Sequence, residues 1–223
     1  MGINTKQPRY EMLDNAIKII QHNTRVSRRK CRVGEEGSLL GDYIEFGCFE
    51  GNTFLHAYKR AAPLMPWMRF WAIDSFQGLP EPSGQDKDGE FWQGQFACDQ
   101  DTFMKNLRDA CVDFNRIVCV PGWFQETLTP ELKRQKNLKI ASIVYVDCDL
   151  YNSAVPVLNY ITDLVETGSV IIFDDWFCFK GNPEKGVQRA CSEWLIANPG
   201  ISLNDWYLFG PYGKSFIVNR KSL

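Results

Sequence analysis

Histidine is scarce in this sequence. Only His22 and His56 occur among 223 residues, and neither lies at the end of a predicted strand. A Ser-His-Asp triad or a histidine general base therefore finds no support in this chain. We interpret each histidine as a surface or packing residue.

An excess of charge of one sign is also missing. The formal net charge is −2 at pH 7, so the chain as a whole lacks the basic surface that nucleic-acid partners require. One basic run, at residues 25–32, contains Arg25, Arg28, Arg29, Lys30 and Arg32. We interpret this run as a solvated flank of the first helix, with contact to phosphates or anionic substrates as the alternative.

Long hydrophobic runs and paired cysteine motifs are absent as well. No apolar run reaches about 18 residues, which argues against a membrane span, and the N-terminus carries no apolar signal core. The eight cysteines form no CxxC pair and show no zinc-ligand spacing. Several lie inside apolar patterns, so we expect reduced, mostly buried thiols and a cytoplasmic protein. They are Cys31, Cys48, Cys98, Cys111, Cys119, Cys148, Cys178 and Cys191.

What is present is a chain long enough for one α/β domain. With 44% hydrophobic residues, 223 residues can build one sizeable core but not two comfortable ones. Apolar side chains recur at helical spacing over residues 8–22, which predicts one amphipathic helix. We therefore divide the chain into an N-terminal helical segment, 1–40, and a main domain, 41–223. The helix either packs on that domain or serves as a lid over a bound ligand.

Strands and helices alternate along the main domain. Five apolar stretches have the length and composition of buried strands, at residues 42–46, 69–73, 117–120, 140–146 and 169–173. Apolar faces with helical spacing lie at residues 52–60, 103–114, 155–165 and 186–197. The segment 83–95 is rich in Gly, Asp and Gln and is predicted to be a mobile surface loop. Two last strands, 205–209 and 215–218, face each other across a Gly-Pro-Tyr-Gly turn.

This order of elements predicts a mostly parallel sheet with helices on both faces. The terminal hairpin adds antiparallel strands, so we expect an α/β fold with a seven-stranded, Rossmann-like sheet. Ligands bind such sheets at the carboxyl ends of the strands, near the point where the strand order reverses. The polar motifs of this chain all follow strand ends, and that coincidence identifies them as a candidate site.

A glycine-containing loop follows the first strand and opens a helix. Gly47 and Gly51 let the backbone turn sharply and approach a ligand, and the helix N-terminus offers free N–H groups to an anion. Phe49 stands where a dinucleotide-binding GxGxxG loop has the glycine that makes room for a pyrophosphate. A donor with one nucleoside and a small carboxylate therefore fits better than NAD, which disfavours an NAD-dependent oxidoreductase.

Two further strand ends offer groups that suit a nucleoside. Asp74 ends the second strand, where a carboxylate can accept hydrogen bonds from two ribose hydroxyls. The alternative for Asp74 and Ser75 is a cap of the turn that follows. Gly122 and Trp123 follow the third strand and supply either a wall for an adenine or core packing.

Four aspartates follow the fourth and fifth strands. Asp147 and Asp149 end the fourth, and Asp174 and Asp175 end the fifth. Because these strands are expected to be neighbours, four carboxylates converge, and like charges at such distances repel unless a cation lies among them. Oxygen ligands without histidine or cysteine favour Mg²⁺, with Mn²⁺ or Ca²⁺ as substitutes. The alternative is that some of these aspartates cap helices or bind Arg and Lys.

Five motifs together resemble one known family, the macrocin O-methyltransferases (TylF-like). The motifs are YIEFGCFEGNTF at 43–54, DSFQGLP at 74–80, GWFQETL at 122–128, VDCDLYNS at 146–153 and SVIIFDDW at 169–176. The resemblance covers nearly the whole chain after residue 40. It implies the seven-stranded methyltransferase version of the Rossmann fold and a Mg²⁺-dependent enzyme. Members of the family move a methyl group from S-adenosylmethionine to hydroxyls of sugars or aromatic natural products.

The resemblance also implies roles for single residues. Asp147, Asp174 and Asp175 correspond to metal ligands, and Asp149 corresponds to the general base. More distant catechol-type methyltransferases carry a lysine base three residues after the first metal aspartate; Leu150 stands there in this chain, which favours Asp149. The donor-binding positions, including their loop neighbours, are Glu45, Gly47, Cys48, Phe49, Gly51, Asp74, Ser75, Gly122 and Trp123.

We hypothesise that a vicinal diol or catechol chelates the metal, which lowers the pKa of the attacking hydroxyl while Asp149 takes its proton. Loop 83–95 is then expected to close over the acceptor. The expected partner is a small hydroxylated molecule, with neither nucleic acid nor membrane, and a homo-oligomer is compatible with the sequence. Two alternatives are a methyltransferase for a catechol-like molecule and a catalytically silent nucleoside-binding module that acts through a partner. The four aspartates disfavour the silent module.

Overall fold

Seven strands form one sheet in the order β3-β2-β1-β4-β5-β7-β6. The first five are parallel, and β7 runs antiparallel to both β5 and β6. The computed structural model describes residues 6–30, 41–87 and 89–221. The predicted α/β fold class, with its seven-stranded sheet and terminal hairpin, is confirmed. The strands are β1 (Asp42–Phe46), β2 (Phe70–Asp74), β3 (Ile117–Pro121), β4 (Ala141–Val146), β5 (Val165–Phe173), β6 (Ile201–Phe209) and β7 (Gly213–Arg220).

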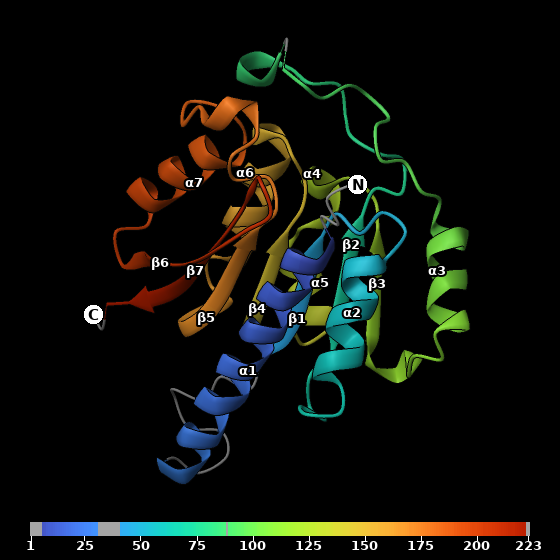
Figure 1. Cartoon of the computed structure of the whole chain (residues 1–223), viewed down its shortest axis with the longest axis vertical. Coiled ribbons are helices and arrows are strands. Elements are labelled where there is room, and N and C mark those ends of the chain that lie inside the picture. Colours follow the sequence, from blue (N-terminus) through green and yellow to red (C-terminus); the bar gives the residue numbers. More distant parts are fainter. Residues whose placement is uncertain (1–5, 31–40, 88, 222–223) are drawn as a thin grey trace.

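Helices cover both faces of the sheet (Figure 1). One face packs against α1, α2 and α3, and the other packs against α6 and α7 together with the short α4 and α5. Neighbouring strand residues alternate between the two layers: Tyr43 belongs to the first core and Ile44 to the second. The helices are α1 (Lys6–Lys30), α2 (Asn52–Ala61), α3 (Gln100–Asp109), α4 (Phe124–Thr127), α5 (Pro130–Gln135), α6 (Tyr151–Ile161) and α7 (Gly186–Ala197).

The register of the parallel strands brings four strand ends to one edge. Phe46 is paired with Ile73 on one side and with Val146 on the other, and Val146 is paired with Phe173. Backbone hydrogen bonds extend this alignment by one residue: Gly47 donates to Ile73, Asp147 to Phe46, and Asp174 to Val146. The polar residues after these strands therefore meet at the carboxyl edge, where β1 and β4 flank the reversal of strand order.

Several predicted element boundaries were wrong. The predicted helix 155–165 begins earlier, at Tyr151, and ends at Ile161, because Val165 pairs with Ala141 and so begins β5. The predicted helix 103–114 ends at Asp109, where Cys111 adopts a left-handed φ of 54°. The first helix runs on beyond residue 22 to Lys30. Cys31 and Arg32 lie outside the described residues.

Helix α1 packs on the sheet as part of the first layer. Met12, Leu13 and Ile17 are at most 2% exposed and belong to the same core as α2. Asp14 accepts hydrogen bonds from His56 and Arg60 of α2, at 3.0 and 2.9 Å. The packing interpretation of His56 is therefore confirmed, and the role of the first helix as a lid stays a prediction. Within the described residues, no helix combines the length and apolar character that crossing a membrane requires.

Candidate active site

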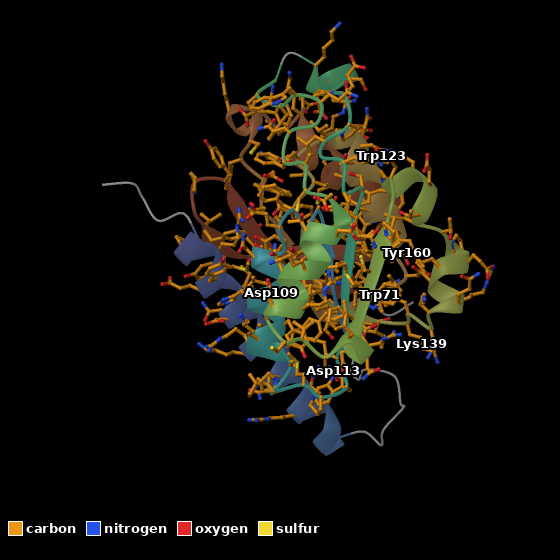
Figure 2. All side chains as sticks on the ribbon, turned by 90° about the vertical axis from the view of Figure 1, so that its right-hand side faces the viewer. Trp71, Asp109, Asp113, Trp123, Lys139 and Tyr160 are labelled. Atoms are coloured by element: carbon orange, nitrogen blue, oxygen red, sulfur yellow. The ribbon has the colours of Figure 1, made fainter. Side chains whose placement is uncertain are left out.

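A cavity of about 630 Å³ opens at the carboxyl edge of the parallel strands. This volume lies in the range of small-molecule sites. Figure 2 shows Trp123, one of the lining residues, toward the upper end of the sheet, and Asp113 and Lys139 toward the opposite end. The expected site residues that line the cavity are Gly47, Cys48, Phe49, Asp74, Ser75, Trp123, Asp147, Asp149, Asp174 and Asp175.

The glycine loop lies tightly against the neighbouring strand end. Gly47 has a φ of 84°, and a Cβ atom there would lie 1.7 Å from the carbonyl oxygen of Asp147. Any side chain at this position would therefore have to displace the backbone that carries the aspartates. Phe49 also has a positive φ, 47°, which a bulky residue rarely adopts, and its ring lies 42% exposed at the cavity. Such strained residues concentrate at ligand sites.

Asp74 fixes the glycine loop through its carboxylate. Its Oδ2 atom accepts hydrogen bonds from the backbone N–H groups of Cys48 and Phe49, at 2.5 and 3.2 Å. Its Oδ1 atom accepts from the N–H of Phe76, at 2.7 Å. Ser75 similarly accepts from its own turn, through Gln77. The capping alternative for both residues is thus realised, while both side chains still face the cavity.

Three of the expected donor-binding residues do not line the cavity. Glu45 is only 1% exposed and accepts a hydrogen bond from the hydroxyl of Tyr43. Burial raises the pKa of Glu45 to about 8. Gly51 packs against the ring of Phe103, and Gly122 forms the tight turn into α4. The role of these three residues in donor binding stays a prediction.

Three carboxylates meet at the other end of the cavity. One oxygen each of Asp147, Asp174 and Asp175 lies within 4.8 Å of the other two. Asp149 lies beside them, with its N–H donating to Oδ2 of Asp175 at 3.1 Å. Its φ of 59° is in the left-handed region. The expected convergence of the four aspartates is therefore confirmed.

Burial and mutual repulsion disfavour negative charge on these aspartates. Burial is the largest cause that raises the pKa of Asp147, Asp149 and Asp175 well above its ordinary range, and neighbouring carboxylates raise it further. The pKa of Asp174 is also raised by burial, although the charge of Arg9 opposes the shift. A divalent cation that joined the cluster would therefore favour the ionised form of each ligand.

Arg9 supplies one positive charge to the cluster. Its guanidinium donates to Oδ2 of Asp174 and lines the cavity from the first turns of α1. The hydroxyl of Tyr145 donates to the other oxygen of Asp174, at 2.6 Å. One of the four aspartates thus binds an arginine, which was the alternative expected for some of them. The other three have no Lys or Arg salt bridge among the described residues.

The predicted mobile loop 83–95 is held in place as a wall of the cavity. Its residues Glu90, Phe91 and Gln95 line the site together with Leu79 and Phe96. The ring of Phe91 packs on Phe179, and Oε1 of Glu90 accepts from the backbone N–H of Phe179 at 2.9 Å. In Figure 1 this green segment arches over the upper ends of the strands. The prediction of a mobile surface loop did not include these contacts with Phe179.

The family model described as Macrocin-O-methyltransferase (TylF) matches residues 26–198, which is more than half of the chain. The chain belongs to the macrocin O-methyltransferase family. The match contains the glycine loop and all four aspartates, whereas Arg9 lies before it. The resemblance inferred from the five motifs is confirmed.

Two curated relatives of this macrocin O-methyltransferase family member come from Streptomyces. The 8-demethyl-8-(2,3-dimethoxy-alpha-L-rhamnosyl)-tetracenomycin-C 4'-O-methyltransferase of Streptomyces olivaceus is 26% identical over 144 residues, which are 61% of this chain and 53% of that protein. Demethyldecarbamoylnovobiocin O-methyltransferase of Streptomyces niveus is 24% identical over the same shares. The chain thus spans about half the length of the curated relatives it matches.

Solved structures of O-methyltransferases share the fold. The O-methyltransferase NovP superposes with a TM-score of 0.70 at 18% identity, covering 96% of this chain and 80% of that one. The calicheamicin methyltransferase CalS11 gives 0.69 at 21% identity with the same coverage. An O-methyltransferase from Bacillus cereus in complex with SAH gives 0.57 at 14% identity, covering 97% and 82%. At these identities the likeness establishes the architecture.

Three residues at or beside the candidate site were not found from the sequence. Arg9 lies on the polar side of α1, and no pattern connects it to aspartates 165 residues later. Tyr145 reads as an ordinary core residue of a buried strand. Asp86 lies in a polar loop, yet it is 1% exposed. Only tertiary contacts distinguish these residues from their neighbours.

Proposed function

We propose that this protein is a Mg²⁺-dependent O-methyltransferase that moves the methyl group of S-adenosylmethionine to a hydroxyl of a sugar or other natural product. One observation carries the proposal: a single cavity joins the glycine loop and Asp74 to the cluster of Asp147, Asp149, Asp174 and Asp175. A donor and a chelated acceptor held at these two ends would meet inside one enclosure, where positioning contributes much of the rate.

The donor end suits S-adenosylmethionine. The loop that opens α2 turns its backbone at Gly47 and Gly51, and Phe49 stands where a dinucleotide-binding loop has the glycine that makes room for a pyrophosphate. Asp74 lies at the end of β2, where it can exchange its loop contacts for ribose hydroxyls. Trp123 and Phe124 line the same end and supply flat apolar surface for an adenine. When bound, the donor supplies a methyl group activated on a sulfonium.

The acidic end suits a hard divalent cation. Asp147, Asp174 and Asp175 offer three oxygens close enough to share one ion, without histidine or cysteine. Burial, and after it repulsion between neighbouring carboxylates, raises the pKa of Asp147 and Asp175, and a dication would favour their ionised forms. Mg²⁺ fits this donor set, with Mn²⁺ or Ca²⁺ as substitutes, and such an ion would lower the pKa of a coordinated hydroxyl.

Asp149 is the residue that this proposal assigns as general base. It borders the cation ligands, is 6% exposed and lines the cavity. Its raised pKa, caused mainly by burial, makes it a stronger base than an exposed aspartate. It would take the proton from the acceptor hydroxyl as the oxygen forms its bond to the methyl group and the sulfur leaves with its bonding electron pair.

The proposed class of acceptor is inferred from the names of the two curated relatives. Both curated relatives are named as methyltransferases of natural products, one of them acting on a rhamnosyl-bearing tetracenomycin. The exposed rings of Phe49 and Phe96 meet at 6.3 Å beside the cavity and suit an apolar portion of such a molecule. A catechol-like acceptor would present the same pair of oxygens. The free thiols of the seven described cysteines support the cytoplasmic location expected from the sequence.

Transfer assays test the function directly. Purified protein, S-adenosylmethionine and Mg²⁺ are incubated with panels of glycosylated natural products, free sugars and catechols, and S-adenosylhomocysteine release is measured. We expect turnover with a vicinal diol and its loss with EDTA. Turnover that survives strong chelation would contradict the metal role. Calorimetric binding of S-adenosylhomocysteine without transfer to any acceptor would favour the silent nucleoside-binding module.

Asp149→Asn tests the assigned base. We expect kcat to fall by about 100-fold or more, because general base catalysis contributes on that order. The affinity for S-adenosylhomocysteine, measured by calorimetry, should stay within a few-fold of the original. Asp205→Asn is the matched control, since Asp205 is an exposed aspartate of β6 that pairs with Lys214. Full activity of Asp149→Asn would rule out the assignment.

A further inference from the structure

Asp86 is a buried carboxylate in a loop that the proposed reaction does not use. It ends a short 3-10 turn, Gly84–Asp86, and is 1% exposed. Its Oδ2 atom accepts from the backbone N–H of Tyr151 at 2.6 Å, and its Oδ1 atom accepts from the N–H of Gly186 at 3.0 Å. Both oxygens are thus engaged by backbone groups that are 65 and 100 residues away in the sequence.

The two N–H groups belong to the first residues of α6 and α7. Neither helix has a side-chain cap of its own: Leu150 and Lys185 occupy the N-cap positions without such a hydrogen bond. Asp86 therefore caps both helices from a distant loop. Burial raises the pKa of Asp86, and the hydrogen bonds from the N–H groups of Gly186 and Tyr151 oppose that shift only in part.

Asp149 lies between these two anchored points. It is two residues before Tyr151, and its carbonyl oxygen packs on Gly186, where an added Cβ atom would approach it to 3.3 Å. Its left-handed φ of 59° is unfavourable for a residue with a side chain, so the surrounding structure must hold it. Asp149 is thus close to Tyr151 in the sequence and to Gly186 in space, and both of these residues are held by Asp86.

We propose that Asp86 is a positioning residue that holds the Asp149 carboxylate in place by capping α6 and α7 together. The same segment walls the cavity through Glu90 and Phe91, and Ser83 accepts a second tie from Asn152 of α6 at 2.9 Å. One segment therefore both covers the site and anchors the two helices next to Asp149. This inference rests on the proposed function for the role of Asp149.

Kinetics on Asp86→Ala and Asp86→Asn test the positioning role. We expect kcat to fall by about 10- to 100-fold, since small displacements of a catalytic group have effects of this order. Affinities for S-adenosylhomocysteine and Mn²⁺, measured by calorimetry, should change less than about threefold, because Asp86 contacts neither end of the cavity. Asp86→Asn keeps the shape of the side chain but loses one of its two acceptor oxygens. It is the variant to measure if Asp86→Ala fails to fold.

Asp99→Ala is the matched control for the loss of a helix cap. Asp99 caps α3 by accepting from the N–H of Thr102 at 2.9 Å, and it does not line the cavity. Its loss should lower stability while kcat stays near that of the original protein. An equal fall in kcat for both variants would mean that loss of any cap suffices and would overturn the positioning role.

A double-mutant cycle distinguishes action through Asp149 from a general structural effect. In the Asp149→Asn background, Asp86→Ala should cause little further loss of kcat, because the group it positions is already gone. Losses that multiply, giving the full effect of Asp86→Ala in either background, would overturn the proposal.

Amide hydrogen exchange tests the anchoring without any turnover. In Asp86→Ala, exchange at residues 149–153 and 186–190 should rise by about tenfold or more, while α3 stays protected. Unchanged exchange would overturn the double cap. Absence of transfer by the unmodified protein would remove the proposed function and, with it, the catalytic part of this inference, whereas the exchange result would still decide the cap.

Discussion

Among single residues, the carboxylates of Glu45 in β1 and Asp74 at the end of β2 differ in their hydrogen-bond partners. Asp74 accepts from three backbone N–H groups, of Cys48, Phe49 and Phe76. Glu45 is buried with the hydroxyl of Tyr43 as its partner. Water is excluded around Glu45, and one neutral donor does not replace it, so burial raises its pKa to about 8.

Glu45→Gln should therefore change how stability depends on pH. The pKa of Glu45 is raised from 4.5 to about 8, so its contribution to stability is fully present below pH 4.5 and is lost as the pH rises toward 8. The loss approaches about 1.4 kcal/mol per pH unit between these values. A glutamine does not titrate, so the unfolding free energy of Glu45→Gln relative to the original protein should rise from pH 5 to pH 8.

Chemical denaturation at several pH values measures this difference. Glu193→Gln is the control, because hydrogen bonds from Tyr151 and Arg189 lower the pKa of exposed Glu193 and place its titration below pH 4.5. That control should follow the original protein between pH 5 and 8. A flat difference for Glu45→Gln across this range would show that Glu45 is already ionised in the folded protein.

At the scale of elements, α1 connects the outer layer to the centre of the site. Its apolar side chains pack on the sheet, and Tyr10 stacks on His56 of α2 with ring centroids 4.2 Å apart. This packing fixes the first turns of the helix above the carboxyl edge. Arg9 thereby reaches Asp174, and the helix contributes both packing and one charged group to the cavity.

Arg9→Gln should tighten binding of a divalent cation. The Arg9 guanidinium binds one oxygen of Asp174, and its positive charge repels a metal cation that approaches the same carboxylate. Removal of the guanidinium should therefore raise the Mn²⁺ affinity by about tenfold. Calorimetry with Mn²⁺ alone measures this without turnover. Arg60→Gln is the matched control, because Arg60 pairs with Asp14 on the outer side of α1. Equal or weaker Mn²⁺ binding by Arg9→Gln would contradict competition for Asp174.

At the scale of the whole molecule, the cavity couples ligand binding to stability. Its walls come from α1, the loops that follow β1 to β5 and the segment 78–96, so a ligand that fills it stabilises contacts across the full width of the parallel sheet. A ligand that binds only the folded state stabilises it by mass action.

S-adenosylhomocysteine at about 100 times its Kd should raise the thermal midpoint by about 5–10 °C, since this contributes about 2.7 kcal/mol in a domain of this size. Mg²⁺ should add a separate increase. Differential scanning calorimetry measures both. In Asp147→Asn the Mg²⁺ increase should disappear while the S-adenosylhomocysteine increase remains. Loss of both increases together would show that the two ends of the cavity are not independent.

Some features of the fold and of the site were predicted from the sequence, and others were not. The aspartates were found because each follows an apolar strand, and neighbouring parallel strands end at one edge. The end of α3 was missed because helical spacing continues through Phe114, although Cys111 turns into a left-handed conformation. The contacts of segment 83–95 were not predicted, because polar composition does not reveal that Asp86 and Glu90 bind distant backbone groups.

Hydrophobic periodicity and short motifs are local properties of the chain, and they were enough to predict the fold class, the strand ends that bear polar groups and the family. The folded structure was needed to find that Arg9 reaches Asp174, that Glu45 is buried and that Asp86 caps two helices. These facts depend on contacts between residues far apart in the chain. Composition and spacing carry no information about which of many similar side chains becomes buried beside which partner.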